Sequence, residues 1–196
     1  MEYLCYNLDK LPLMGEGEHL LTEAESERYG NRPTYAKTAR ILLKQELERR
    51  TGIPAQRIEL RYNEHGKPYY PGIFFNISHS ANMLCMAFHH ADIGVDIQKK
   101  RPRARREELA KRIMCEEQLR AFINLGCPED AFFECWCIAE ALVKHAGATI
   151  WQAPDFPFIL HPTHVELLRD NTLTVERFRP ASDFYGAVAY TNTACT

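Results

Sequence analysis

The pattern of apolar and polar positions predicts short strands in each half of the chain, with helices between them. Alternating runs predict strands at 2–8, 57–63, 73–80, 82–90 and 92–98. Helical periodicity is seen at 22–30, from about 33 to 51, and at about 106–125 and 130–146. Two alternating runs around Asp170-Asn171 predict a hairpin over 163–179, and a last strand is expected at 183–191.

Helix-end signals sharpen two of these assignments. Thr22 and Glu25 have the spacing of a capping box, and Gly30 would end that first helix. Pro33 suits the start of the longer helix and Gly52 its end. Lys37, Arg40 and Lys44 on this longer helix are interpreted as a solvated basic face.

The order of elements indicates an α+β fold with two similar lobes, 1–91 and 92–196, each with a small, mainly antiparallel sheet and helices. Composition fits a soluble globular protein, with 45% hydrophobic and 26% charged residues. The net charge of −2 excludes a whole-molecule polyanion binder, so any such attraction needs a local patch. Seven cysteines, an odd number, favour reduced thiols in a cytoplasmic protein over a disulfide framework. Neither a signal peptide nor a membrane span is expected.

Four short polar segments are candidates for chemistry. The turn "GKP" (66–68) presents Lys67, and "FNISHS" (75–80) ends in Ser78, His79 and Ser80. In "GVDIQ" (94–98), Asp96 and Gln98 would share one face of a strand whose other face is apolar. The fourth feature is a carboxylate and an ammonium one helical turn apart, Glu140 and Lys144, in an otherwise apolar helix.

Each of these segments also has an ordinary structural explanation. Glu140 and Lys144 could form an i,i+4 ion pair on an exposed edge, and the hydroxyls of 75–80 could be satisfied at a strand end. Taken together, two carboxylates, Asp96 and Glu140, suit Mg²⁺, which uses few carboxylates and completes its shell with water and phosphate oxygens. Lys67, His79 and Lys144 could then face those phosphates. The sequence therefore predicts a metal-assisted site for a pyrophosphate-bearing substrate, without a P-loop or GxGxxG motif.

The order "GKP", "FNISHS", "GVDIQ" and "W-x-x-x-E-A-x-x-K", within about residues 66–147, resembles the 4′-phosphopantetheinyl transferases. The likeness is to their longer, two-lobed, surfactin-synthetase-activating type. It implies a pseudo-dimer of lobes in one chain, with coenzyme A and Mg²⁺ (or Mn²⁺) in the cleft between them. It also implies transfer of phosphopantetheine from coenzyme A to a serine of an acyl or peptidyl carrier protein, with release of 3′,5′-ADP. Fatty-acid and polyketide or peptide carriers both remain open.

The resemblance also implies roles for single residues. Asp96, Gln98 and Glu140 would hold the metal, and Glu140, Lys144 and Asp96 would be catalytic. Coenzyme A would contact a wider set: Lys67, Pro68, Ser78, His79 and Lys144. Contact of coenzyme A with Lys37, Arg40 and Lys44 on the early helix is an alternative to the solvated face, but no motif there aligns securely. Two positions depart from the pattern. Gln98 stands where many relatives have Glu, and Ala139 where they usually have a Lys that could reach round to a phosphate.

Two other functions are considered. The departures at Gln98 and Ala139 allow a coenzyme A or carrier-protein binding module with weakened catalysis. The basic run "KKRPRARR" (99–106) allows a nucleic-acid binder, although no recognition fold accompanies it, and nucleic acid is disfavoured as a partner. An alternative role for this run is to dock an acidic carrier protein.

Overall fold

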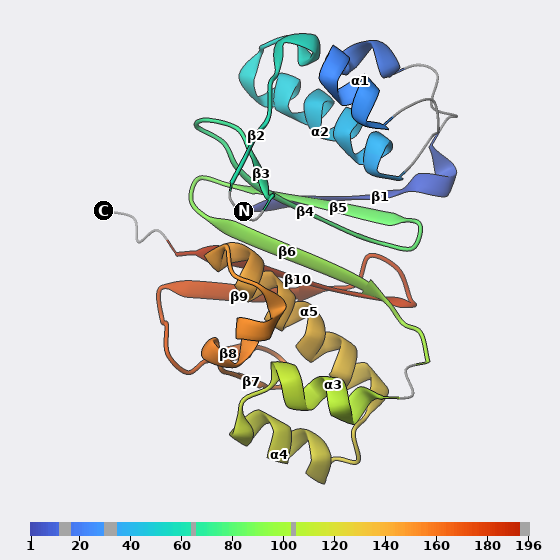
Figure 1. Cartoon of the computed structure of the whole chain (residues 1–196). Helices are drawn as coiled ribbons and strands as arrows, with labels where there is room; N and C mark the ends of the chain where they lie inside the picture. The colour runs from blue at the N-terminus through green and yellow to red at the C-terminus, as the bar shows by residue number, and fades with distance from the viewer. Residues whose placement is uncertain (12–16, 30–34, 64–65, 103–104, 193–196) are drawn as a thin grey trace. The chain divides into compact units, whose positions relative to one another are not determined.

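A computed structural model describes residues 1–11, 17–29, 35–63, 66–102 and 105–192. The chain is α+β, with small antiparallel sheets and helices (Figure 1). It divides into two compact units, one of residues 1–5 with 72–196 and one of residues 6–71. These units do not coincide with the predicted lobes, 1–91 and 92–196, because β4 and β5 pack against β6, the strand expected to open the second lobe. The two-lobe division itself stays a prediction.

The larger unit contains two three-stranded sheets. One has the order β1-β5-β4, formed by Glu2–Asn7, Met83–His89 and Phe74–Ser80. The other has the order β6-β10-β9, formed by Ile93–Lys99, Phe184–Thr191 and Leu173–Phe178. β10 is antiparallel to both neighbours, and its register sets Asp96 opposite Ala187. The central strands, β5 and β10, consist mainly of apolar, aromatic and small residues that are buried on both faces.

Helix α5 (Glu129–Ala146) packs along β6 and β10, and Figure 1 shows it beneath these strands. Half of its eighteen residues are buried, as the apolar composition of this segment requires. Gly147 ends the helix at φ 68°, a left-handed conformation that glycine adopts without steric cost. Helices α3 (Arg106–Ile113) and α4 (Glu116–Asn124) and the 3-10 helix η4 (Ile150–Asp155) complete this core.

The smaller unit is built around α2 (Tyr35–Thr51), with α1 (Glu23–Tyr29) before it. The predicted capping box is confirmed, because Thr22 N donates to Glu25 Oε2 at 3.0 Å and Glu25 N donates to Thr22 Oγ1 at 3.3 Å. The remaining elements of this unit are short: η1 (Leu8–Lys10), η2 (Glu18–Leu20), η3 (Ala55–Arg57), β2 (Arg61–Tyr62) and β3 (Pro68–Tyr69).

The basic residues of α2 do not form a solvated face, and that prediction is wrong. Lys37, Arg40 and Lys44 are 2%, 7% and 0% exposed. Lys44 Nζ lies 2.8 Å from Glu25 Oε2, and Arg40 Nη2 donates to Tyr62 at 2.5 Å. Buried charges are tolerated where they are paired in this way. The sequence pattern missed them because a cation and its partner are far apart along the chain.

Other predicted elements need correction. The run 57–63 forms only the two-residue strand β2 after a 3-10 turn. The hairpin predicted over 163–179 is wrong, because β8 (Val165–Leu167) pairs with β7 (Phe158–Leu160) while β9 pairs with β10. Alternation shows which side chains share a face, but it does not identify the partner strand. Gly30 and Pro33 lie outside the described residues.

Candidate active site

The site begins with the close approach of helix α5 to strand β6. Gly94 lies against the helix so tightly that a Cβ there would be 2.0 Å from the Ala141 carbonyl oxygen and 2.4 Å from the His145 amide nitrogen. Glycine in a strand interior often marks such close contact. The approach brings Asp96, two residues along β6, to the face of α5 that carries Glu140 and Lys144.

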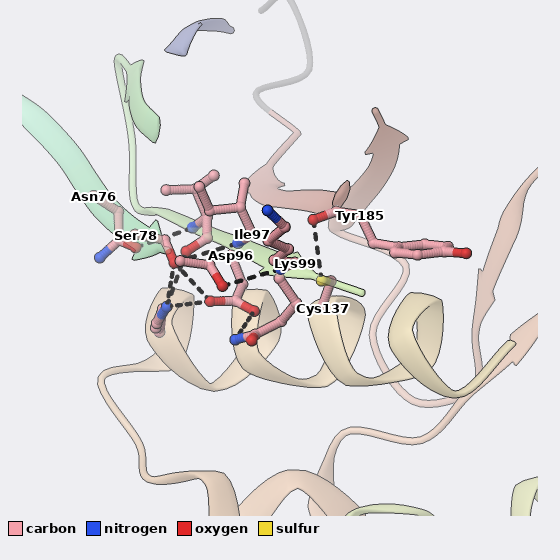
Figure 2. Close-up of polar contacts among 11 residues, drawn as sticks. Asn76, Ser78, Asp96, Ile97, Lys99, Cys137 and Tyr185 are labelled. Atoms are coloured by element: carbon pink, nitrogen blue, oxygen red, sulfur yellow. Dashed lines mark hydrogen bonds and ion pairs between the residues drawn. The ribbon is translucent and has the colours of Figure 1, made fainter. Parts of the chain in front are cut away.

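Asp96 is a buried carboxylate that accepts hydrogen bonds from a lysine, a serine and a glutamine side chain. Its residue is 2% exposed, and its Oδ1 accepts from Lys144 Nζ and from Ser78 Oγ, each at 2.7 Å. Its Oδ2 accepts from Gln98 Nε2 at 3.3 Å. Lys144 Nζ also donates to the Val95 carbonyl at 3.2 Å. Figure 2 shows the Asp96 carboxylate between its strand and the helix. The ammonium thus compensates a charge that could not stay buried alone.

The hydroxyl of Ser78 is fully used by this arrangement. It donates to Asp96 and accepts from Ile97 N at 3.3 Å and from Lys144 Nζ at 3.2 Å. A serine hydroxyl has one donor and two acceptor positions, so all three are occupied. Ser78 therefore holds Asp96 and Lys144 in place, a role that was not predicted from the sequence. Its contact with coenzyme A stays a prediction.

Strand β4 contacts β6 through side chains on alternate residues. Asn76 Oδ1 accepts from Val95 N at 3.0 Å, Ser78 Oγ from Ile97 N, and Ser80 Oγ from Lys99 N at 3.0 Å. Figure 2 shows Asn76 and Ser78 directed from their strand toward β6. These side chains satisfy amide groups of β6 on the side away from β10. These three side-chain hydrogen bonds fix where β6, and with it Asp96, lies relative to β4.

Asp96 raises the pKa of both Glu140 and Lys144, which favours the neutral form of the carboxyl and the charged form of the ammonium. Burial raises the pKa of the Glu140 carboxyl, repulsion from Asp96 raises it further, and Lys144 partly offsets both. Burial by itself lowers the pKa of Lys144, but the charge and hydrogen bond of Asp96 and the charge of Glu140 outweigh it, so the pKa is raised. Lys144 therefore stays charged at neutral pH. The two carboxylates share one ammonium, which leaves excess negative charge.

The donors at this site are oxygen atoms that suit a hard divalent cation. Asp96 and Glu140 supply carboxylates, and Gln98 supplies an amide oxygen from the same strand as Asp96. Within the described ranges, no group of three or more His, Cys, Asp or Glu side chains forms a metal site. A cation here would therefore depend on the Gln98 oxygen, water or substrate oxygens for its other ligands.

One predicted residue of the larger unit, His79, is not directed at this cluster. His79 is exposed and follows Ser78 directly on β4, so its side chain lies on the other face of the strand. Lys67 and Pro68 belong to the smaller unit, in the turn before β3 and in β3 itself, and both are half-buried. The assignment of these three residues to coenzyme A stays a prediction.

Ala139 differs from the expectation that a side chain here could reach round to a substrate. It is 2% exposed and belongs to the hydrophobic core beneath the sheet. Trp136 packs against the same core, with its ring 5.8 Å from that of Phe132. Residue 139 therefore faces apolar side chains in this chain, and a lysine at this position would be buried among them.

The basic run at 99–106 is partly neutralised by the start of α5. Lys100 Nζ lies 2.5 Å from Asp130 Oδ1, and Arg106 Nη1 lies 3.1 Å from Glu129 Oε1. Arg101 and Arg105 are exposed, and residues 103 and 104 lie outside the described ranges.

In the part of the chain that the structure describes, no helix has the length and apolar character needed to cross a membrane.

Comparisons with known proteins identify relatives of one kind. The sequence profile of the 4′-phosphopantetheinyl transferase superfamily matches residues 92–190. Over 121 residues the chain is 30% identical to the 4′-phosphopantetheinyl transferase HetI of Nostoc sp., covering 57% of this chain and 51% of HetI. It is 30% identical over 112 residues to the 4′-phosphopantetheinyl transferase Sfp of Bacillus subtilis, covering 55% and 49%. A putative 4′-phosphopantetheinyl transferase of Haemophilus influenzae is 29% identical over 152 residues, covering 72% and 63%. The matching part of the chain thus spans about half the length of HetI and Sfp.

Proposed function

Because the chain belongs to the 4′-phosphopantetheinyl transferase superfamily, we propose that it transfers 4′-phosphopantetheine from coenzyme A to a serine of an acyl or peptidyl carrier protein. This would make it a holo-[acyl-carrier-protein] synthase that releases 3′,5′-ADP. The observation that carries the proposal is the cluster of Asp96, Glu140 and Lys144, in which Ser78 hydrogen-bonds both Asp96 and Lys144. All three charged residues fall inside the matched region, 92–190.

The donor set fits Mg²⁺ as the resident cation. Asp96, Gln98 and Glu140 would hold it, since hard oxygen donors and excess negative charge favour a small divalent ion. The bound ion would neutralise charge on the pyrophosphate of coenzyme A. Binding has a readout that needs no substrate. Millimolar Mg²⁺ should raise the melting temperature of the wild-type chain, and Asp96→Asn should abolish that rise.

The chain's own residues would divide the reaction between them. The serine oxygen of the carrier would form a bond to the β-phosphorus of coenzyme A, while the bond from that phosphorus to the oxygen of the leaving 3′,5′-ADP breaks. Glu140 would accept the serine proton, since a carboxylate with a raised pKa is a stronger base than an ordinary one. Lys144 stays charged and would stabilise the negative charge on the leaving group.

Mass spectrometry of an apo carrier protein incubated with coenzyme A, Mg²⁺ and the full chain tests the reaction. The carrier should gain one phosphopantetheine, and both chelator and Asp96→Asn should prevent that gain. Asp92→Asn is the matched control, because Asp92 is exposed beside the same strand, and it should behave like the wild type.

Two other outcomes would overturn the proposal. Binding of coenzyme A without modification of several acyl and peptidyl carriers would indicate the binding module, which the amide of Gln98 in place of a carboxylate favours. Full transfer in excess chelator, or by Asp96→Asn, would remove the metal and Asp96 from the reaction.

A further inference from the structure

The thiols of Cys5 and Cys85 lie close together, although the two residues are 80 positions apart in the sequence. Their sulfur atoms lie 3.1 Å apart and share a hydrogen bond. Cys5 is on β1 and Cys85 on β5, neighbouring strands of one sheet, and both belong to the larger unit. Both are free cysteines, and bond formation requires their sulfurs to approach by about 1 Å.

The two thiols differ in access to solvent. Cys85 is 0% exposed in a cluster with Met83, Ala87 and Val95, whereas Cys5 is half-buried at the margin of that cluster. The shared hydrogen bond lowers the pKa of Cys5, while that bond and burial raise the pKa of Cys85. The thiol that attacks an external disulfide needs access to solvent and thiolate character, and Cys5 is the more accessible thiol with the lowered pKa. Cys85, as the resolving thiol, needs no access to solvent, but it must lose its proton before it attacks the nearby Cys5 sulfur.

The position of the pair links it to the rest of the larger unit. Cys85 lies directly opposite Ser78 in the β4–β5 register, so it neighbours the residue that holds Asp96. β1 is an edge strand, and Tyr3 on it stacks on Phe178 of β9 with ring centroids 4.3 Å apart. A covalent link between Cys5 and Cys85 would attach this edge strand to the centre of its sheet.

We propose that Cys5 and Cys85 form a redox-active pair that a low-molecular-weight disulfide, such as glutathione disulfide, converts into an intramolecular disulfide. The Cys5 thiolate attacks one sulfur of glutathione disulfide, forming a mixed disulfide and releasing one glutathione. Deprotonated Cys85 then attacks the Cys5 sulfur and releases the second glutathione. The protein loses two protons and two electrons, and glutathione disulfide gains them to become two thiols. The proposal does not depend on transferase activity.

The test uses the reduced full chain, incubated with glutathione disulfide without denaturant, alkylated, digested and analysed by mass spectrometry. The wild type should yield a cross-linked peptide containing Cys5 and Cys85 that dithiothreitol removes. Because the link closes a long loop, the oxidised chain should melt at a higher temperature than the reduced chain. Cys115→Ser is the matched control, since Ser keeps the helix N-cap at this position, and it should still form the cross-link.

Two variants separate the roles of the thiols. Cys85→Ser should retain a stable glutathione adduct on Cys5, while Cys5→Ser should yield neither the adduct nor the cross-link. If Cys85→Ser does not fold, the comparison of Cys5→Ser with the wild type remains, because Cys5 is half-buried and a serine is tolerated there. The proposal is overturned if the wild type keeps a lasting adduct on Cys5, if both thiols remain open to alkylation, or if Cys85 links to another cysteine.

Discussion

At the scale of single residues, Asp96 depends on the groups that compensate its charge. An isolated carboxylate with 2% exposure would be protonated or would destabilise the fold. Lys144 and Ser78 both contact the same carboxylate oxygen, Oδ1, whereas Oδ2 contacts the weaker donor Gln98. The carboxylate therefore has one strongly held side and one side that a cation could take over by displacing the amide.

Glu140 should reduce the stability of the fold at neutral pH. Its folded-state pKa is raised above 4.5, first by burial and then by Asp96, so the folded chain binds the proton more tightly than the unfolded chain. The free energy of unfolding must then fall as pH rises through that window. In chelator, Glu140→Gln should melt at a higher temperature than the wild type at about pH 8, and the difference should vanish near about pH 4. Transfer activity should be lost in the same variant.

Thermal denaturation over this pH range, monitored by circular dichroism, measures the effect. Glu134→Gln is a control on the same helix, because Glu134 is paired with Arg177 at 2.8 Å and should lose stability rather than gain it. A wild type whose melting temperature exceeds that of Glu140→Gln at every pH would contradict the predicted destabilisation by Glu140.

Ala139→Lys should destabilise the chain. The residue is 2% exposed within the core, so an ammonium there must be desolvated or must force the surrounding side chains apart. The expected cost is about 2–4 kcal/mol in the free energy of unfolding, measured by urea denaturation. Ala146→Lys, at an exposed position on the same helix, should cost less than about 0.5 kcal/mol. Equal stability of the two variants would mean that residue 139 is open to solvent.

At the scale of elements, the distance between β6 and α5 is fixed by Gly94. A Cβ on this residue would meet helix backbone, at 2.0 Å from the Ala141 carbonyl oxygen, and backbone cannot rotate away. Gly94→Ala should therefore displace α5 and separate Lys144 from Asp96. We expect a loss of at least about 2 kcal/mol in the free energy of unfolding, together with loss of the Mg²⁺-dependent rise in melting temperature.

Gly186→Ala offers a matched control on the neighbouring strand β10. A Cβ there would meet the ring of Phe178 at 2.5 Å, and a side chain can move where backbone cannot. Its cost should be about 1 kcal/mol, with the response to Mg²⁺ retained. If both glycine variants respond alike to Mg²⁺, the spacing of β6 and α5 does not determine the site.

The elements also show what a single sequence can specify. Periodicity found α5 and the strands β4, β5, β6 and β10, because burial of one or both faces leaves a direct mark on residue type. The same pattern marked Asp96, Glu140 and Lys144 as candidate site residues, because charged side chains are rare in apolar segments. It did not find the partner of β8, or the role of Ser78, since both depend on contacts between distant parts of the chain. Gly94 had a readable signal, a glycine inside a buried strand.

At the scale of the whole molecule, the family match is concentrated in one part of the chain. It covers residues 92–190, which include β6, α5 and the cluster of Asp96, Glu140 and Lys144. The β4 residues that contact β6, Asn76, Ser78 and Ser80, lie before this region. The site nevertheless belongs to one compact unit, because β4 and β5 pack against β6. The structure thus extends the candidate site beyond the matched region, to a strand that supplies positioning contacts.

The net charge of −2 does not favour an acidic carrier, so attraction for one must come from the basic run at 99–106. Lys99, Lys100 and Arg106 are engaged by Asp183, Asp130 and Glu129. Arg101 and Arg105 are exposed, and Arg105 Nε lies 3.8 Å from the exposed Glu108, so both charges can be reversed with little effect on packing. Arg101→Glu with Arg105→Glu should raise the KM for the carrier roughly 3- to 10-fold and leave the KM for coenzyme A unchanged.

The increase in the KM for the carrier should be smaller at high salt, because exposed charges are screened within about 10 Å at 0.1 M salt. Steady-state kinetics at two salt concentrations measure both quantities, with Arg120→Glu combined with Arg169→Glu, at two exposed positions, as the control with the same change in net charge. If the control raises the KM for the carrier equally, the attraction arises from total charge, and the basic run has no special part in docking.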